Sequence, residues 1–414
     1  MRTEDVDVAV IGGGPSGMAA AVSARKAGAE RVLLIERGER LGGILNQCIH
    51  DGFGTKLLGK AYTGPEYAQL FIDLVDETAV TSAMNTMVLD LSSERELVVC
   101  SEEGMRRIRA GSVVLCMGCR ERSRGAIRIP GTRPAGVYTA GVVQEYMNLR
   151  DIMVGRKVVV LGSGDVGLIM ARRLTLEGAK VPCVAELLPY PSGLARNVVQ
   201  CLDDFGIPLL LSTTVVETHG TERLTGVTLA NVGPKGGIVP GSKRYVACDT
   251  LMLSVGLIPE NELSKKAGVE LSPVTGGPVV DDRLQTSIPG IFCAGNALQV
   301  HDLVDYVSME ADKAGLSATE FADKGRLSPS KINVHPGSGV RYVVPQEISG
   351  EETVDFSMRV LKPDSDRYIV IRSSGQIIRK MKQTVLEPSS MIRVRVRADR
   401  FNNVQGDLTV EVGA

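Results

Sequence analysis

A glycine turn between two short apolar strands, within residues 5–43, constrains the fold of this chain more than any other feature. The turn has the spacing Gly12-x-Gly14-x-x-Gly17, and an alanine-rich helical run follows it. The next strand delivers Glu36, nineteen residues after Gly17. Glycines let backbone amides approach a pyrophosphate closely, and an acid at this distance can accept hydrogen bonds from a ribose diol. Strand, turn, helix, strand and acid in this order predict a dinucleotide-binding unit rather than a structural turn.

The same arrangement occurs again 150 residues later. Gly162, Gly164 and Gly167 repeat the glycine spacing, and Glu186 lies nineteen residues after the last of them. One offset shared by every element indicates an internal duplication, so two dinucleotides are expected. Pro182 falls inside the second strand of this copy, where it would remove a ladder hydrogen bond. We therefore expect that strand to begin at the proline.

Composition narrows the class of protein. The 414 residues are 43% hydrophobic, which fits an α/β protein of two or three domains. Lys and Arg number 47 against 48 Asp and Glu, so no global field favours nucleic acid or an anionic membrane. No run resembles a signal peptide or a membrane-spanning helix. The eight scattered cysteines are typical of reduced thiols, we expect a cytoplasmic protein, and the four dispersed histidines predict no metal site.

Other segments carry weaker signals. Residues 44–54, ILNQCIHDGFG, form a loop that looks too polar and glycine-rich for core and that follows the first unit directly. A long helix is expected from near Asp305, because apolar residues recur there at helical spacing. Three apolar strands each end at a glycine: they cover 112–116, 251–255 and 290–293, and the glycines are Gly118, Gly256 and Gly295.

Beyond Lys324 the chain changes to short alternating runs separated by Gly, Pro and Ser, which predicts a small all-β domain. In residues 391–397, Ile, Val and Val alternate with Arg393, Arg395 and Arg397. This basic face has two interpretations: a solvated outer strand, or a docking surface for an acidic partner.

Both fingerprints, the segment 256–259 and the strand end at Gly295-Asn296 together resemble the two-dinucleotide-binding-domain flavoproteins. The resemblance covers about residues 5–325 and implies FAD in the first unit and NAD(P)H in the second. It predicts an α/β fold with two Rossmann-like domains, the second inserted in the first, plus a small C-terminal all-β domain. The predicted domains are 1–124 and 260–328 for FAD, 125–259 for NAD, and 329–414 for a β domain that serves as an interaction module.

The resemblance also implies the cofactor-binding residues. Asn296 stands where the family has Asp, which keeps a hydrogen-bonding side chain but removes a charge. Glu186 would accept from a ribose 2′-hydroxyl and repel a 2′-phosphate, which favours NADH over NADPH. The helix near Asp305 would direct its positive N-terminus to the flavin N1 and C2 oxygen. The implied FAD residues are Gly12, Gly14, Ser16, Gly17, Glu36, Arg37, Gly43, the backbone near Met87, Gly118, Gly295 and Asn296; the implied NADH residues are Gly162, Gly164, Asp165, Gly167 and Glu186.

Absent cysteines separate this chain from disulfide reductases of the same family. Leu45 and His50 stand where glutathione reductase-type enzymes carry their cysteine pair. Cys116 and Cys119 form a Cys-x-x-Cys, but it precedes the second fingerprint, whereas thioredoxin reductase has its pair inside the NAD domain. The two thiols are either a redox pair or residues that pack and turn a strand end. We predict an FAD-dependent NAD(P)H oxidoreductase that is not a disulfide reductase.

Four longer strings resemble a narrower group, the bacterial flavoprotein subunits of multicomponent dehydrogenases. They are LGGILNQCIHDGFG, MGCRER, IPGTRPAGVYTAG and GNALQVHDLVD. The group includes subunits associated with FAD-dependent glycerol-3-phosphate dehydrogenase, opine oxidase and hydrogen cyanide synthase. The resemblance implies hydride transfer between NADH and FAD, and a hetero-oligomer with a second flavoprotein dehydrogenase and, as a further candidate, a small cysteine-rich protein.

Two hypotheses remain beside this one: a non-catalytic FAD-containing assembly subunit, and a free-standing NADH oxidase. In the loop after the first unit, Cys48 and His50 are candidate catalytic residues that would line the flavin ring, with His50 tuning its potential or moving a proton. The alternative is that both residues only hold the loop.

Overall fold

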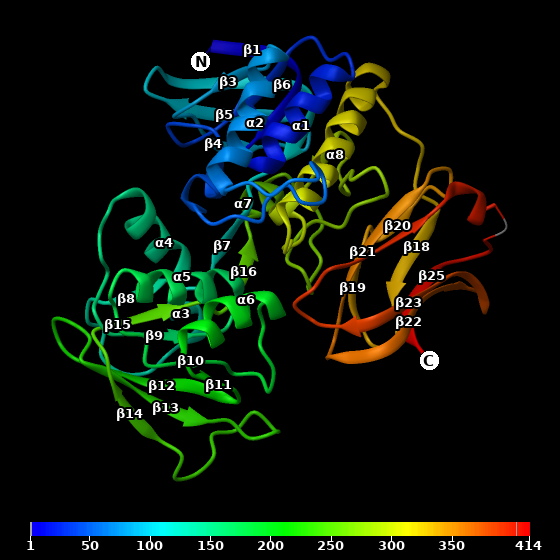
Figure 1. Ribbon diagram of the computed structural model, residues 1–414. Coiled ribbons are helices and arrows are strands. Elements are labelled where there is room, and N and C mark those ends of the chain that lie inside the picture. The colour runs from blue at the N-terminus through cyan, green and yellow to red at the C-terminus, as the bar shows by residue number, and fades with distance from the viewer. Residues whose placement is uncertain (1, 403) are drawn as a thin grey trace. The chain divides into compact units, whose positions relative to one another are not determined.

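The computed structural model describes residues 2–402 and 404–414 and divides the chain into two compact units (Figure 1). Unit 2 interrupts the sequence of unit 1, and the chain passes between them in β7 (Cys119–Glu121) and β16 (Leu257–Pro259). Unit 1 comprises Met1–Cys119 and Pro259–Ala414, and unit 2 comprises Arg120–Ile258.

The sheet of unit 1 has the order β3-β2-β1-β6-β5-β4, with β17 paired to β6. Val8 and Val10 of β1 have no exposed surface, as expected for a parallel strand covered on both faces. Ile11 pairs with Ile35, so β1 and β2 end side by side and Glu36 emerges next to the glycine turn. The strands are β1 (Arg2–Ile11), β2 (Val32–Ile35), β3 (Thr81–Ala83), β4 (Met87–Leu91), β5 (Glu96–Ser101), β6 (Gly104–Leu115) and β17 (Ile291–Cys293).

Two helices of unit 1 pack closely against each other. Gly315 of α8 faces the backbone of α1, where a Cβ would overlap the carbonyl oxygen of Ala20. Ser23 of α1 donates to the carbonyl oxygen of Asp312 at 2.8 Å. The helices are α1 (Pro15–Lys26), η1 (Gly43–Gln47), α2 (Gly64–Glu77), α7 (Glu262–Lys266), η3 (Gly295–Ala297) and α8 (Val304–Lys324).

Unit 2 repeats the parallel arrangement on a smaller scale, with the strand order β11-β10-β9-β15-β8 and a separate sheet β12-β13-β14. Its strands are β8 (Val137–Thr139), β9 (Val158–Leu161), β10 (Val184–Ala185), β11 (Leu209–Leu210), β12 (Thr213–His219), β13 (Gly226–Asn231), β14 (Arg244–Ala247) and β15 (Thr250–Leu253). Its helices are α3 (Arg124–Ile127), α4 (Ala140–Leu149), α5 (Asp165–Leu176), α6 (Ala195–Cys201) and η2 (Asp203–Phe205).

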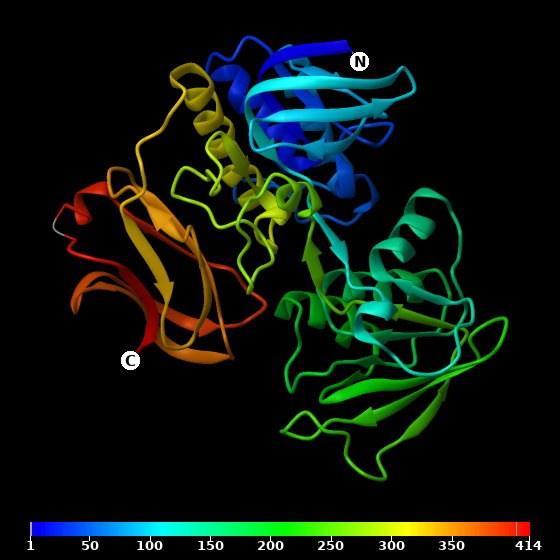
Figure 2. The same cartoon turned by 180° about the vertical axis from the view of Figure 1, so that it is seen from behind.

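The C-terminal part of unit 1 is all-β, as predicted, and is seen from both sides in Figures 1 and 2. Its two sheets, β20-β18-β25-β22-β23 and β19-β21-β24, share one apolar core that includes Val343, Phe356, Ile371 and Val394. The strands are β18 (Ile332–Pro336), β19 (Val340–Val344), β20 (Glu347–Ile348), β21 (Val354–Val360), β22 (Asp364–Ser373), β23 (Gln376–Leu386), β24 (Ile392–Val396) and β25 (Leu408–Gly413), with η4 (Ala398–Arg400) before β25.

The alternation in residues 391–397 is confirmed: β24 is an outer strand of its sheet, and Arg395 and Arg397 are exposed. Arg395 makes a two-pronged contact with Asp355 at 2.9 and 2.7 Å, and Arg393 lies 3.8 Å from the same carboxylate. Arg397 pairs with Asp399 at 2.8 Å. Each arginine therefore has an acidic neighbour within this chain, which reduces the net charge that an acidic partner would meet.

Two local expectations were wrong. The loop 44–54 is not excluded from the core, because Leu45, Gln47 and Cys48 are buried and residues 43–47 form a 3-10 helix. The second strand of unit 2 begins at Val184 rather than at Pro182, and only two residues of it pair. The other main segments lie where the pattern placed them, and the fold class is confirmed.

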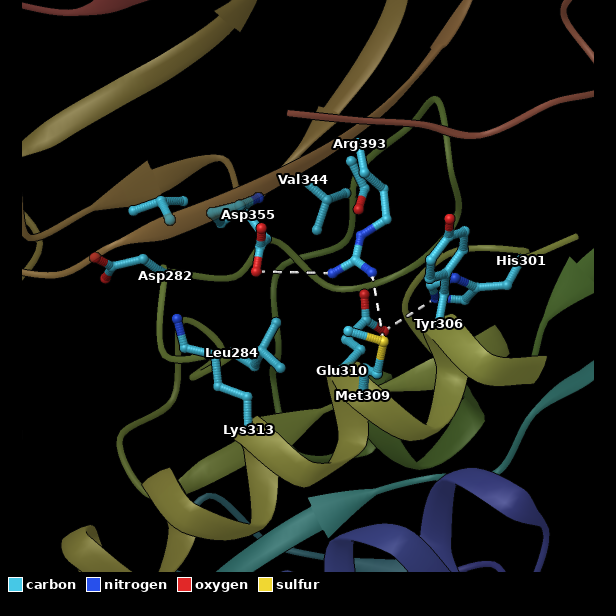
Figure 3. Close-up of a pocket in the computed structure, with 13 residues that line it drawn as sticks. Asp282, Leu284, His301, Tyr306, Met309, Glu310, Lys313, Val344, Asp355 and Arg393 are labelled. Atoms are coloured by element: carbon cyan, nitrogen blue, oxygen red, sulfur yellow. Dashed lines mark hydrogen bonds and ion pairs between the residues drawn. The ribbon is translucent and has the colours of Figure 1, made fainter. Parts of the chain in front are cut away.

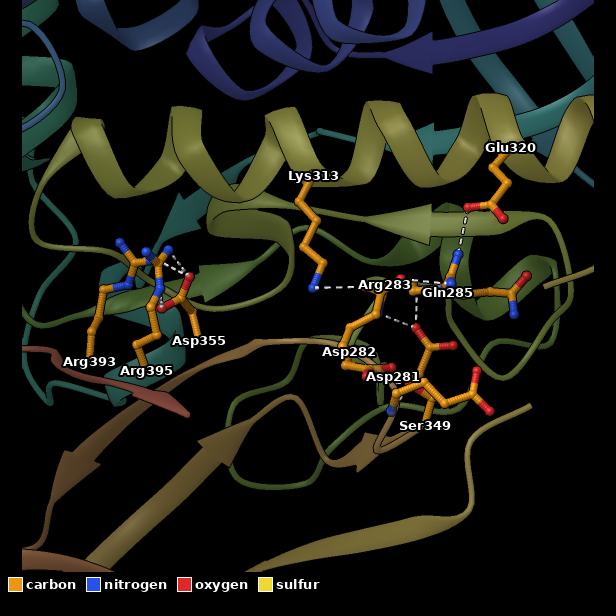
Figure 4. Close-up of polar contacts among 12 residues, drawn as sticks. Asp281, Asp282, Arg283, Gln285, Lys313, Glu320, Ser349, Asp355, Arg393 and Arg395 are labelled. Atoms are coloured by element: carbon orange, nitrogen blue, oxygen red, sulfur yellow. Dashed lines mark hydrogen bonds and ion pairs between the residues drawn. The ribbon is translucent and has the colours of Figure 1, made fainter. Parts of the chain in front are cut away.

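A partly buried polar cluster joins the segment 281–285 to α8 and to the β-sandwich (Figure 4). Arg283 contacts Glu320 of α8 at 2.5 Å and Glu352, which precedes β21, at 2.6 Å. Asp281 accepts hydrogen bonds from the backbone N–H groups of Arg283 and Gln285, both at 2.9 Å. Burial nevertheless raises the pKa of Asp281 to about 6, since removal from water outweighs these two donors.

The raised pKa predicts a pH-dependent stability. A carboxyl group whose pKa is higher in the folded state contributes stability that is fully present below its unfolded pKa, near 4, and is lost as the pH rises through about 6. Asp281→Asn removes the ionisation while keeping an acceptor oxygen. We expect the variant to melt at a higher temperature than the parent at pH 8, with the difference shrinking at pH 4. Glu103→Gln, at an exposed turn, is the control; equal differences at both pH values would contradict the prediction.

Candidate dinucleotide sites

The first glycine turn is built for close backbone approach. Gly12 has φ +107°, and a Cβ there would overlap the carbonyl oxygen of Cys116. A Cβ on Gly17 would overlap the carbonyl oxygen of Gly12. In front of Gly14 the nearest atom is the Cα of Gly43, 4.0 Å from where a Cβ would lie. Backbone atoms thus fill the space beside Gly12 and Gly17, whereas the space in front of Gly14 is free. A pyrophosphate held by the amides at the start of α1 would fit there.

Glu36 lies beside this turn and is partly exposed. Its Oε2 accepts from the N–H of Gly13 at 2.6 Å, and its Oε1 accepts from the N–H of Gly38 at 2.7 Å. A carboxylate offers about four acceptor positions, so two remain for a ribose diol. The N–H of Thr86 donates to the backbone oxygen of Glu36, which brings the start of β4 and Met87 alongside. This geometry fits the adenosine half of FAD.

Several residues implied for FAD face the protein rather than open space. The Ser16 hydroxyl is buried and donates to the Cys116 sulfur at 3.1 Å, so only its backbone is available to a phosphate. Asn296 accepts from the N–H of His301 at 2.9 Å and points its amide nitrogen to Cys119, 3.6 Å away. Arg37 is exposed.

No disulfide joins Cys116 to Cys119. Their sulfurs face different partners, Ser16 and Asn296 respectively. Burial raises the pKa of Cys116 to about 12, which disfavours a thiolate. Gly118, between them, has φ +71°, and its carbonyl accepts from Glu260, so it turns the chain out of the strand. These observations favour packing and turning over redox chemistry at this pair.

Asp305, in the first turn of α8, organises the loop after the first unit. It is fully buried and accepts three backbone hydrogen bonds, from Gly54 at 3.2 Å, Lys56 at 3.0 Å and Leu57 at 2.7 Å. Three amide donors and the helix N-terminus compensate the buried charge. Sequence reasoning used Asp305 only to mark a helix start. An acid in a first helical turn, downstream of the Gly295-Asn296 strand end, was the available signal.

The two candidate catalytic residues lie on this loop. Cys48 is buried, and its thiol donates to the carbonyl oxygen of Ile44 at 3.3 Å. The His50 ring stacks at a tilt on Phe53, with centroids 5.1 Å apart. Both contacts are local, and they match the interpretation that these residues hold the loop.

A second polar group, missed from the sequence, centres on Glu310 of α8. Its Oε1 accepts from the N–H of Gly295 at 2.8 Å and lies 3.1 Å from Nε2 of His301, while Oε2 accepts from Gln299 at 2.8 Å. Glu310 and His301 line a cavity of about 60 Å³ between α8 and the β-sandwich, with Arg393 on the opposite wall (Figure 3). The strand end expected at the flavin is therefore held by α8.

The second turn repeats the geometry of the first. Gly162 has φ +90°, and a Cβ there would overlap the carbonyl oxygen of Ser254. Glu186 accepts from the N–H of Ser163 at 2.9 Å and from the N–H of Leu188 at 2.9 Å, matching the two amide contacts of Glu36. Gly164 and Gly167 both face Ser254. The turn again places amides at the start of a helix, here α5, as a pyrophosphate site requires.

Asp165 has a different place from the one expected. Its Oδ1 accepts from the N–H of Leu194 at 2.8 Å and from the side chain of Asn197 at 2.6 Å. The carboxylate therefore ties α5 to the loop of residues 187–194 and to α6, and its backbone alone faces a pyrophosphate.

Comparisons with known proteins agree with this geometry. The family model described as pyridine nucleotide-disulphide oxidoreductase matches residues 6–317. The HcnB subunit of hydrogen cyanide synthase from Pseudomonas protegens is 27% identical over 91% of this chain and 80% of its own length. An opine oxidase subunit from Agrobacterium tumefaciens is 29% identical over 95% of this chain and 76% of its own length. Thioredoxin reductase of T. acidophilum has the same fold over 78% of this chain and 99% of its own, with a TM-score of 0.63 at 23% identity.

Among the described residues, no helix is both long and apolar enough to cross a membrane.

The geometry of the first site predicts that Glu36 is needed for FAD retention. Glu36→Gln should weaken FAD binding about tenfold or more, because a hydrogen bond to a charged acceptor contributes roughly 1.5–3 kcal/mol. The measurement is the flavin-to-protein absorbance ratio after dialysis against increasing dilutions. Glu39→Gln, an exposed acid three residues away, is the matched control. Equal flavin retention in both variants would refute the assignment.

Proposed function

Because the chain belongs to the pyridine nucleotide-disulphide oxidoreductase family, we propose that it transfers hydride between NADH and bound FAD and exchanges the electrons with a partner protein. The family binds FAD and NAD(P), so an oxidoreductase with these cofactors is the premise. The preference for NADH, the partner and the route of the electrons are the proposal.

The observation that carries the proposal is the repeated turn-and-acid geometry. In both units an acid at the end of the second strand accepts from an amide of the glycine turn: Gly13 to Glu36 at 2.6 Å, and Ser163 to Glu186 at 2.9 Å. Two such sites in one chain suit one nucleotide that stays bound and one that exchanges. The presence of a carboxylate at each site favours a free ribose diol over a 2′-phosphate, which supports NADH.

The residues of unit 1 would hold and tune the flavin. Bound FAD supplies two-electron chemistry with a nicotinamide, and the protein supplies position and electrostatics. Glu36 and the amides near Gly14 would hold the adenosine and pyrophosphate. Asp305 fixes the loop of residues 54–57 at the start of α8, so this loop and the helix N-terminus form one rigid edge. Cys48 and His50 lie on the same loop and remain candidates for a tuning role.

We further propose that the chain is not a disulfide reductase. Leu45, at the first position of the glutathione reductase-type cysteine pair, is buried in the core of unit 1, and His50 stands at the second position. In unit 2, burial raises the pKa of Cys201 to about 11 and that of Cys248 to about 12, and it also raises the pKa of Cys183. Such thiols are poor nucleophiles near neutral pH. Electrons would therefore leave the flavin by another route.

That route leads, in this proposal, to a second flavoprotein dehydrogenase of the glycerol-3-phosphate dehydrogenase kind, with a small cysteine-rich protein as a further candidate. The names of the HcnB and opine oxidase relatives describe them as subunits, which supports a multicomponent assembly. The β-sandwich would be the interaction module. A cytoplasmic location remains a prediction from the reduced cysteines.

Anaerobic stopped-flow mixing tests the hydride step. NADH should bleach the flavin absorbance near 450 nm, and an equal concentration of NADPH should do so at least about tenfold more slowly, because a 2′-phosphate meets a carboxylate and loses a hydrogen bond. The same protein without nicotinamide nucleotide serves as the control for photoreduction.

Each alternative has its own outcome. Failure of both nucleotides to bleach the flavin would refute hydride transfer and favour a non-catalytic assembly subunit. Rapid oxygen consumption by the isolated chain with NADH would favour a free-standing oxidase over a subunit that delivers electrons to a partner.

A further inference from the structure

The two acids that mark the nucleotide sites differ in how many donors they already hold. Glu36 accepts two hydrogen bonds, both from backbone amides. Glu186 accepts the two equivalent amide bonds and two more, from the hydroxyls of Ser163 at 2.6 Å and Ser192 at 2.9 Å. Three of these four donors meet Oε2. With the same backbone geometry, each carboxylate oxygen of Glu36 meets one donor, whereas Oε2 of Glu186 meets three and Oε1 meets one.

The extra donors come from two substitutions between the repeats. At the 150-residue offset, Ser163 corresponds to Gly13 and Ser192 corresponds to Gly42. Glycine has no side chain to offer, whereas each serine places a hydroxyl on the acid. The two serines also bond each other: the N–H of Ser192 donates to Oγ of Ser163 at 2.8 Å. They form one cap over the carboxylate.

The cap leaves Oε2 of Glu186 little capacity for a ligand. A carboxylate oxygen has about two acceptor positions, and Oε2 already meets three donors, whereas Oε1 meets only the N–H of Leu188. Glu186 is only 4% exposed, whereas Glu36 is partly open. A ribose 2′-hydroxyl can donate to Oε2 of Glu186 only by displacing a serine hydroxyl. Ser192 is the one to leave, because it is exposed and Ser163 is fully buried.

The surrounding loop holds Ser192 in this position. Gly193 lies so close to the turn that a Cβ would stand 2.6 Å from the carbonyl oxygen of Ser163. The next residue, Leu194, donates its N–H to Asp165 at 2.8 Å. Contacts of the two residues that follow Ser192 thus support the cap.

We propose that Ser192 is a specificity-determining residue of the second dinucleotide site, whose hydroxyl competes with the ribose 2′-hydroxyl for Glu186. This inference rests on the proposed function in one respect, since it takes NAD(H) as the occupant of unit 2. It predicts that the parent chain binds NAD⁺ more weakly than a variant in which Glu186 is present and the Ser192 hydroxyl is absent. It also predicts that the parent chain discriminates against a 2′-phosphate less strongly than a Ser192→Ala variant does, because a neutral hydroxyl stands in front of the charge of Glu186.

The test is calorimetric titration of the FAD-containing full chain with NAD⁺ and with NADP⁺, which do not reduce the flavin. Ser192→Ala should tighten NAD⁺ binding about fivefold, because it removes one of the three donors that compete for Oε2 of Glu186. NADP⁺ binding should stay the same or weaken, so the ratio of the two dissociation constants rises. Ser242→Ala is the matched control, since that hydroxyl bonds only the backbone of its own hairpin.

A double-mutant cycle separates competition from a general loosening of the loop. The increase in NAD⁺ affinity caused by Ser192→Ala should disappear when Glu186 is also replaced by Gln. The acceptor position that Ser192 vacates then no longer belongs to a carboxylate. A gain that persists with Glu186→Gln would overturn the proposal, as would NAD⁺ affinities of parent and Ser192→Ala that agree within about twofold. Absence of NAD⁺ binding in both would also overturn it.

The fate of the proposed function is read separately. Tighter NAD⁺ binding in Ser192→Ala without any flavin bleaching by NADH would refute hydride transfer and leave the role of Ser192 intact. Flavin bleaching by NADH together with an unchanged NAD⁺ affinity in Ser192→Ala would support hydride transfer and refute the role of Ser192.

Discussion

The structure depends most on one hydrogen bond, from the second residue of a glycine turn to the acid at the end of the next strand. In unit 1 it joins Gly13 to Glu36, and in unit 2 it joins Ser163 to Glu186. The bond requires that two parallel strands end side by side, as β1 and β2 do. Because the acid is anchored to the turn, the groups that would hold pyrophosphate and ribose form one rigid unit. The rest of the fold holds these two turn-and-acid sites in place.

Residues far away in the sequence hold the segments around the turn-and-acid site of unit 1. Asp305 holds the loop of residues 54–57, and Glu310 holds the strand end at Gly295. The β-sandwich reaches the same region, since Arg359 donates to the carbonyl oxygen of Val300 at 3.1 Å and the N–H of Met391 donates to Asp302 at 3.0 Å. The sandwich is thus part of the scaffold around residues 295–305, and a protein that docks on it would act on a segment tied to the strand end.

Pattern reasoning succeeded where local chemistry decides the conformation. The glycine turns, the long helix at 304–324 and the alternating strands of the C-terminal region follow from backbone sterics and hydrophobic periodicity. It failed where burial depends on distant partners. The loop 44–54 looked solvated, yet Leu45 and Cys48 pack beneath Gly64, where a Cβ would overlap the carbonyl oxygen of Leu45. Nothing local to the loop indicates that contact.

The sequence by itself determined the two turns, their acids, the duplication and the class of cofactor, because each rests on residue types at fixed short spacings. Only the tertiary structure decided how available each acid is. The duplicated spacing predicts equal roles for Glu36 and Glu186, but the donors that crowd Oε2 of Glu186 include a hydroxyl from a loop that folds back onto the turn. The number of donors that already occupy an acid depends on which residues surround it in space, and the spacing of residues along the chain does not give that number.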